Sequence, residues 1–287
     1  GPPQVRVVSI RLDNALVRLD KANFGPFDAR VNIDVKGELE DASITTQDGR
    51  LKALIKPDKS KYLIDASATS WAMPIGPAFV FDELIIKGVA TFNDANLDEV
   101  SAKLYGGTAN GKATISWQKG LQFHSSLDVN QVEMQKIASL LSSKTHISGK
   151  LTAKPILSAS AASADHLMNA LRLETPFNVH NGVIHGVDIQ KAATGLIKQG
   201  VTGGETRFDQ LSGHLVMEHG SYRFTQLQIA SGALAADGNV SISPKKELAG
   251  RINAQVKAVG TGATVPLNVA GTVDAPLLFP TAGTVAG

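Results

Sequence analysis

Seven histidines are the first side chains to weigh for metal binding or proton transfer. His180 and His185 lie close in the sequence, but a hairpin turn at Asn181-Gly182 would point them to opposite faces of a sheet. His214 and His219 are similarly placed, and we expect no acidic partner near them. Zinc needs three or four ligands that converge on one point. The pattern therefore predicts solvent-facing or turn-capping histidines and no metal site.

Paired carboxylates are the second candidates, at Asp82-Glu83, at Asp98-Glu99 and between Glu38 and Asp41. All lie at predicted turns, whereas general acid–base catalysis needs carboxylates that converge on a pocket with separated pKa values. The chain has neither a G-x-S-x-G nucleophile elbow nor a P-loop. Its glycine cluster at 200–204 follows a helical segment, whereas a phosphate cradle opens one. We expect no catalytic residues, no cofactor and no enzymatic activity.

The amino-acid composition argues against several kinds of partner and site. The 28 Lys and Arg residues nearly balance the 26 Asp and Glu residues and are interspersed with them, which argues against a nucleic-acid-binding surface. Cysteine is absent, which excludes disulfides and cysteine-ligated metals. No apolar run reaches the ~18 residues that span a bilayer, and no signal peptide is visible. Gly1-Pro2 resembles the remnant of a protease site, so we expect a fragment of a larger protein.

Alternation of apolar and polar residues predicts the elements that must position these side chains. Val8, Ile10 and Leu12 alternate with polar residues, and similar segments recur about every ten residues with turn residues between them. This spacing is typical of an antiparallel meander with one apolar and one polar face. A two-residue loop at Asp13-Asn14 would pair Leu12 with Ala15, so that both flanking segments share the apolar face.

Dipeptides that favour a positive φ predict the other hairpins. Asn181-Gly182 suits a type I′ turn and would pair Val179 with Ile184. His219-Gly220 would pair Leu215 with Phe224 and Met217 with Tyr222. Further turns are predicted at Gly106-Gly107, which pairs Leu104 with Ala109, at Ser231-Gly232, which pairs Ile229 with Leu234, and at Asp237-Gly238.

Three segments have helical spacing, at 132–141, at 163–172 and in IQKAATGLIKQ (189–199). Asp188 precedes the third segment, where its carboxylate can accept hydrogen bonds from the first-turn amides. An apolar stripe of Ile189, Ala192, Ala193 and Leu196 suits packing on the sheet or closure of one end of an open groove. We favour closure, because meander hairpins need no helix to connect them. A membrane-surface helix would need a larger apolar face and more basic residues.

The apolar face of so many strands must be covered in some way. It can pack on a second sheet, close into a barrel or curl around a ligand, and the pattern alone suits a β-sandwich core about as well as the alternatives. If the face lines a groove, its candidate lining residues are Val8, Ile10, Leu12, Val17, Leu104, Ile115, Phe123, Leu215 and Phe224.

The order of motifs resembles the C-terminal region of the AsmA family of Gram-negative envelope proteins. That family has a G-x-x-x-G-[IV]-D turn into a helix, then T-x-F-x-x-L-x-G and a hairpin. The turn matches PFNVHNGVIHGVDI (176–189), and the rest matches residues 206–242. Further similarity lies in KLYGGTANGKATISW (103–117), ISGKLTAKP (147–155) and VPLNVAGTVDAPLLFPT (265–281). Each motif alone is loose, and the resemblance is carried by their order.

The resemblance implies a mostly β protein, a long antiparallel meander curled into an apolar half-pipe with about three short helices. We expect one continuous unit with residues 3–130 in the N-terminal sheet, 131–200 containing helices, 201–280 as a C-terminal meander and 281–287 as a disordered tail.

The family also implies a function. It is that of a periplasmic segment, anchored to the inner membrane by a helix that this fragment lacks, which shelters phospholipid in the groove. Phospholipid and outer-membrane components would be its partners. The alternative is an assembly or scaffolding factor for outer-membrane proteins that binds strands through an open sheet edge.

Overall fold

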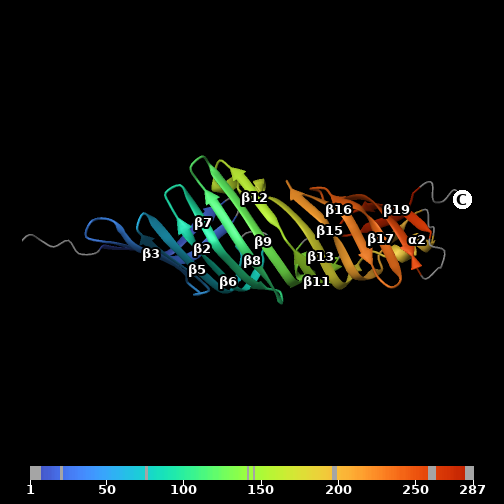
Figure 1. Ribbon diagram of the computed structural model, residues 1–287, viewed down its shortest axis with the longest axis horizontal. Coiled ribbons are helices and arrows are strands. Elements are labelled where there is room, and N and C mark those ends of the chain that lie inside the picture. The colour runs from blue at the N-terminus through green and yellow to red at the C-terminus, as the bar shows by residue number, and fades with distance from the viewer. Residues whose placement is uncertain are drawn as a thin grey trace, which may run out of the picture. The chain divides into compact units, whose positions relative to one another are not determined.

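The computed structural model describes residues 8–19, 22–74, 77–140, 142–144, 146–195, 199–257 and 263–281. The described residues are mostly in β-strands (Figure 1). Their 20 strands belong to one antiparallel sheet. The chain divides into two compact units. The N-terminal unit comprises Gly1–Leu127 with Leu157–Leu171, and the C-terminal unit comprises Asp128–Ile156 with Arg172–Gly287.

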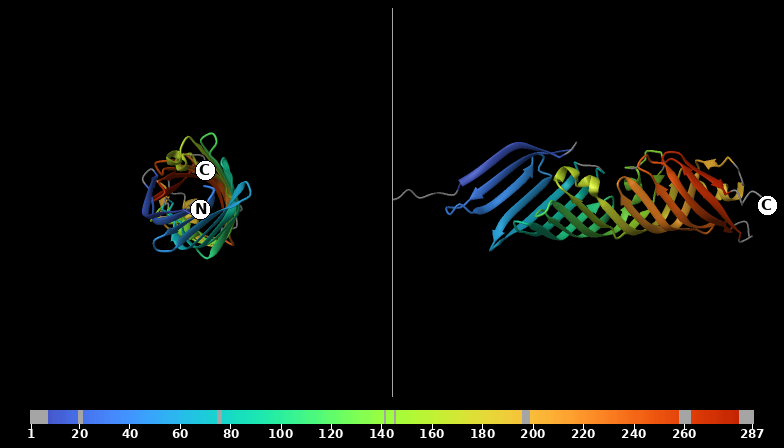
Figure 2. Two further views of the ribbon diagram at one scale, coloured as in Figure 1. Left: turned by 90° about the vertical axis from the view of Figure 1, so that its left-hand side faces the viewer. Right: turned by 90° about the horizontal axis from the view of Figure 1, so that it is seen from above.

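The N-terminal unit is a meander in which successive strands pair antiparallel from the first to the eighth. Figure 2 shows its strands following a curved surface. The strands are β1 (Val8–Leu19), β2 (Ala22–Ile33), β3 (Leu39–Thr46), β4 (Leu51–Asp58), β5 (Lys61–Ala72), β6 (Val80–Ala90), β7 (Asp94–Leu104), β8 (Gly107–Ser116) and most of β9 (Leu121–Glu133) and β12 (Ile156–Ala161). Two single 3₁₀ turns follow β12, at Ala164–His166 and Met168–Ala170.

The register of these strands separates an apolar face from a polar one, because directly opposed residues share a face. One row on the apolar face runs from β1 to β7 through Leu12, Ala29, Ile44, Ala53, Ala66, Ile86 and Val100. The adjacent row on the other face is mostly polar: Arg11, Arg30, Ser43, Leu54, Asp65, Lys87 and Glu99. We call the first surface the apolar face of the N-terminal unit.

The described residues of the C-terminal unit form a second run of antiparallel strands and two helices. The helices are α1 (Met134–Ala138) and α2 (Ile189–Gly195). The strands are β10 (His146–Ile147), β11 (Lys150–Ala153), β13 (Arg172–His185), β14 (Val201–Thr202), β15 (Glu205–Glu218), β16 (Ser221–Ala230), β17 (Leu234–Ile242), β18 (Leu248–Val256), β19 (Thr264–Gly271) and β20 (Pro276–Pro280).

The sheet of the C-terminal unit wraps around α2. The helix contacts β15, β18, β19 and β20, strands at both ends of the run from β15 to β20. Strand β20 pairs with β19 on one side and with β14, which follows the helix, on the other. Ser142, which follows α1, donates a 2.5 Å hydrogen bond from its hydroxyl to Asp274 in the β19–β20 turn. These contacts close the unit around the helix.

Two of the predicted hairpins are wrong, because the chain continues straight through them. Asp13-Asn14 lies inside β1, where Leu12 pairs with Ala29 and Ala15 with Phe27, so the strand carries one extra residue there. This is a β-bulge, and it keeps Leu12 and Ala15 on one face. Asn181-Gly182 lies inside β13, which stays paired with β15 on both sides of it.

The four other turn predictions have different outcomes. The His219-Gly220 hairpin is confirmed, with Leu215 opposite Phe224 and Met217 opposite Tyr222. The turn near Gly106 is one residue earlier than predicted, so Leu104 pairs with Gly107. The turn after β16 spans four residues, because Ser231 accepts backbone N–H groups at its hydroxyl, and Ile229 then pairs with Ala236. Asp237-Gly238 lies within β17 and is not a turn.

The helices are shorter than predicted. Residue 132 still belongs to β9, so the first helix begins at Met134. The segment 163–172 forms the two 3₁₀ turns in place of an α-helix. The third helix is described from Ile189 to Gly195, and Leu196 lies outside the described residues.

Candidate functional site

The apolar face of the N-terminal unit exposes large aliphatic side chains. Ile10 is 49% exposed, Leu12 57% and Ile44 37%, although all three stand on this face. The buried apolar residues among the described part of this unit are Leu104 and the alanines Ala68, Ala95, Ala102, Ala113 and Ala159. The exposed side chains of Ile10, Leu12 and Ile44 thus belong to β1 and β3. In β5, β7 and β8 the same face has buried side chains, those of Ala68, Ala95, Ala102, Leu104 and Ala113.

The predicted lining residues divide between the two units. Val8, Ile10 and Leu12 lie on the apolar face in β1, and all are exposed. Leu104 is buried on the same face, next to the Ala102–Ala109 pair, whereas Ile115 opposite Ala95 and Phe123 in β9 are partly buried.

The remaining three candidates lie elsewhere or outside the described side chains. Val17 pairs with Phe24 in the backbone, but its side chain lies outside the described residues. Leu215 and Phe224 face each other in the C-terminal unit, where both are partly buried. Phe224 meets Phe177 edge to face, with 5.9 Å between the ring centroids.

The C-terminal unit fills its apolar face with its own side chains. A row from β9 to β19 comprises Val132, Leu151, Val179, Leu211, Ile229, Ala236, Ala254 and Val265. Ile189, Ala192 and Ala193 of α2 are buried in the same cluster as Leu234 and Leu267. The helix therefore covers part of the apolar face of the C-terminal unit.

The T-x-F-x-x-L-x-G motif holds α2 in place. The Thr206 hydroxyl accepts the Ile189 N–H at 3.1 Å and donates to the Val187 carbonyl at 2.7 Å, which fixes the entry into the helix. Phe208 and Leu211 are buried beside the helix. A Cβ at Gly213 would lie 3.0 Å from Leu227 and 3.1 Å from Phe177, so a side chain here would crowd the core.

The preceding G-x-x-x-G-V-D motif serves the same purpose. Gly182 is packed so tightly that a Cβ would meet the Ser148 carbonyl, and Gly186 has a φ of 98°, a conformation that favours glycine. Asp188 then accepts the Lys191 N–H at 2.9 Å through its carboxylate, the hydrogen bond of an N-cap residue.

His214 has an acidic partner that the sequence did not reveal. His214 Nε2 lies 2.9 Å from the Glu174 carboxylate, and Arg172 bridges Glu174 at 2.9 Å and Glu218 at 3.5 Å. Hydrogen bonds from His214 and then Arg172 lower the pKa of Glu174. The expectation that His214 has no acidic neighbour is therefore wrong. The group is partly exposed on β13 and β15, and within the described residues no three metal-binding side chains converge.

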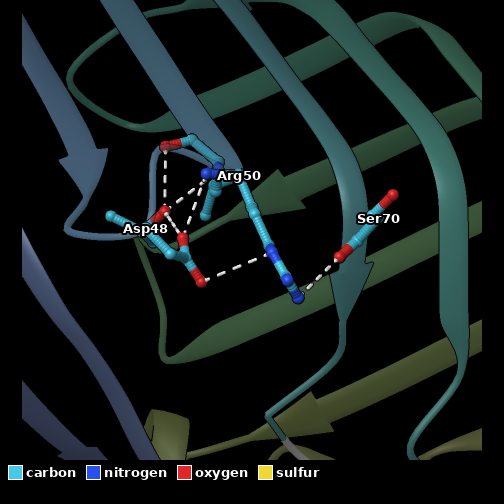
Figure 3. Close-up of polar contacts among 5 residues, drawn as sticks. Asp48, Arg50 and Ser70 are labelled. Atoms are coloured by element: carbon cyan, nitrogen blue, oxygen red, sulfur yellow. Dashed lines mark hydrogen bonds and ion pairs between the residues drawn. The ribbon is translucent and has the colours of Figure 1, made fainter.

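A second polar group braces the N-terminal unit. Asp48, in the β3–β4 turn, accepts the Arg50 N–H at 3.0 Å and the Thr46 hydroxyl at 2.7 Å, and the first of these is the main cause of its lowered pKa. The Arg50 guanidinium reaches the Ser70 carbonyl near the end of β5 at 3.2 Å (Figure 3). These contacts tie adjacent strand ends together, a structural role.

The described part of the chain has no helix that meets the length and hydropathy of a membrane span. Comparisons with curated proteins and with solved structures gave no match. The AsmA family model matches residues 83–227, from β6 to β16, which is half of the chain. The match includes both glycine motifs and α2, so the sequence resemblance is confirmed and the chain belongs to the AsmA family.

Proposed function

We propose that the apolar face of the N-terminal unit binds phospholipid acyl chains, as part of a periplasmic segment anchored to the inner membrane that transfers lipid or shelters it. Membership of the AsmA family supports the location and the anchor. The observation that carries lipid binding is the unbroken apolar row from β1 to β7, which leaves Leu12 and Ile44 exposed.

The energetic reason lies in the cost of exposing acyl chains. Each methylene that leaves an apolar environment costs about 0.8 kcal/mol. Two acyl chains of ~16 carbons therefore cost on the order of 25 kcal/mol to pull into water by the same rule. A continuous aliphatic surface removes much of this barrier by contact alone. The proposed activity needs no covalent chemistry and no cofactor.

The test compares two neighbouring residues of β3 that point to opposite faces. Ile44→Asp places a charge on the apolar face, and Ser43→Asp places the same charge on the polar face. We expect Ile44→Asp to reduce crosslinking to a phospholipid with a photoreactive acyl chain by about tenfold or more, because desolvating a carboxylate costs several kcal/mol. Ser43→Asp should crosslink like the unmodified protein.

Thermal unfolding of both variants serves as the control for folding. Equal crosslinking by two folded variants would reject the proposal, and so would an absence of phospholipid from protein purified out of a membrane extract, as judged by native mass spectrometry.

A second candidate function has its own observation. Among the described residues β1 pairs only with β2, so the other edge of this 12-residue strand offers backbone groups for strand addition. An assembly factor for outer-membrane proteins could bind strands there. A proline in β1 at a residue whose N–H faces the open edge would impair such binding and leave crosslinking to the photoreactive phospholipid unchanged. A complex that survives the proline would exclude this edge.

A further inference from the structure

Three neighbouring turns of the N-terminal unit lie at one end of the strands, where three aromatic side chains are found: Tyr62, Phe92 and Trp117. The turns are the β4–β5 turn at 59–60, the β6–β7 turn at 91–93 and the β8–β9 turn at 117–120. Their backbones are linked, since Trp117 N–H donates to the Asn93 carbonyl at 3.0 Å and Tyr62 pairs with Ala90. We call the three turns and Tyr62 the aromatic rim.

Phe92 is the most exposed large apolar residue among those described, at 81%, and Trp117 is 41% exposed. A phenylalanine at the tip of a turn gains nothing from folding when it stays in water. The Phe92 ring nevertheless packs against Tyr62, edge to face, with 6.2 Å between the ring centroids. The rim therefore holds an aromatic ring in solvent.

Two polar groups beside the rings already have hydrogen-bond partners within the protein. The Trp117 indole N–H donates to the Phe92 carbonyl. The Thr91 hydroxyl donates to the Asp94 carboxylate at 2.7 Å and accepts the Asn93 N–H at 3.1 Å. Because the indole N–H already has an acceptor within the protein, the Trp117 ring can enter a less polar medium without leaving this donor unpaired.

Basic residues lie at the same end of the strands as the rings. Lys56, Lys59, Lys61 and Lys119 are exposed at this end of the strands, and the acidic residues beside them are Asp58 and Asp94, the second of which is bound to Thr91. Aromatic rings with lysines at the same end of the strands suit the interface of a bilayer, where the rings lie at headgroup level and the ammonium groups meet anionic lipids.

We propose that the aromatic rim docks the protein on the surface of an anionic phospholipid bilayer, with Phe92 and Trp117 inserted at headgroup level. This inference rests on the proposed lipid binding and adds where the lipid comes from, since docking would bring the end of the apolar face next to a bilayer. A protein partner could bind the same rings, and the experiment below distinguishes binding of a protein from binding of a bilayer.

The chain has two tryptophans, so Trp71→Phe leaves Trp117 as the only indole reporter. With vesicles of phosphatidylcholine and phosphatidylglycerol, we expect its emission to shift to the blue and to be quenched by brominated acyl chains. Phe92→Ala should weaken vesicle partitioning about tenfold, the effect of losing one partly buried aromatic ring. High salt should also weaken it, because it screens the lysines.

Val80→Ala is the matched control, since Val80 is an exposed apolar residue at the opposite end of the same strands. It should bind vesicles as the unmodified protein does. Unshifted Trp117 emission, or equal binding by the Phe92 and Val80 variants, would overturn the inference.

The outcomes separate this inference from the proposed function. If the protein co-purifies with phospholipid but does not bind vesicles, the docking proposal is refuted and the proposed lipid binding is not. Protein that docks through Phe92 but never crosslinks at the apolar face would refute lipid sheltering alone.

Discussion

Gly182 in β13 and Ser148, which precedes β11, approach so closely that a Cβ on the glycine would lie 1.8 Å from the Ser148 carbonyl oxygen. The same Cβ would lie 2.7 Å from the Phe208 ring, which packs beside α2. Gly182 is also the first glycine of the motif that leads into α2. Glycine is therefore required at position 182 because a side chain would collide with neighbours on two sides. A special backbone conformation is not the reason.

This relationship predicts that Gly182→Ala destabilises the protein by about 3 kcal/mol, the upper end of the usual cost of overpacking. The shift would be measured as a lower midpoint of urea unfolding followed by circular dichroism. Gly232→Ala is the control, because nothing lies within 4 Å of its Cβ position. It should change the free energy of unfolding by less than about 1 kcal/mol. Equal stability of the two variants would contradict the tight packing at Gly182.

Asp188 gives a second prediction, because its carboxylate accepts the Lys191 N–H at the start of α2. Asp188→Asn keeps an acceptor and should be nearly neutral, whereas Asp188→Ala should lower the free energy of unfolding by about 1 kcal/mol. Urea unfolding of the two variants measures the difference. A folded Asn variant that no longer binds lipid would instead assign a functional role to the charge.

The Glu174 carboxylate predicts how stability depends on pH. Its pKa is lowered in the folded state from the ordinary 4.5, first by His214 and then by Arg172. A lowered folded pKa means that the stabilisation is fully present above about pH 4.5, the unfolded value, and is lost as the pH falls through the folded pKa.

Glu174→Gln should therefore flatten the acid limb of the stability profile, measured by urea unfolding at a series of pH values. Glu40→Gln, which removes an exposed carboxylate from β3, should leave that limb as it is. If the acid limb is unchanged in the Glu174 variant, protonation of Glu174 does not contribute to the pH dependence of the free energy of unfolding.

The strand meander and its two faces could be predicted because the alternation of apolar and polar residues is local. The turns could be predicted only in part. A positive φ is required at Asn14 and Asn181, as it would be in a type I′ turn, but the structure uses it inside strands. The same local preference serves a bulge or a hairpin, and the choice depends on partners such as Ala29 in β2 and Phe208 in β15.

The apolar residues of the candidate site could be predicted from the sequence. Whether each of them is exposed or buried could not. Ile10 and Leu234 look alike in the sequence, yet the first is exposed and the second is buried in the cluster that contains α2. The pairing of His214 with Glu174 also escaped prediction, because the two residues are forty positions apart and meet only when β13 pairs with β15.

The division of the chain has a consequence for the order in which the protein can fold. The N-terminal unit includes Leu157–Leu171, which the chain reaches only after Asp128–Ile156 of the other unit. A nascent chain that has emerged as far as Leu127 lacks β12, the strand that pairs with β9. Domains usually complete their folding in the order of synthesis. Here the first unit stays unfinished until residue 171, and no single proteolytic cut can release it whole.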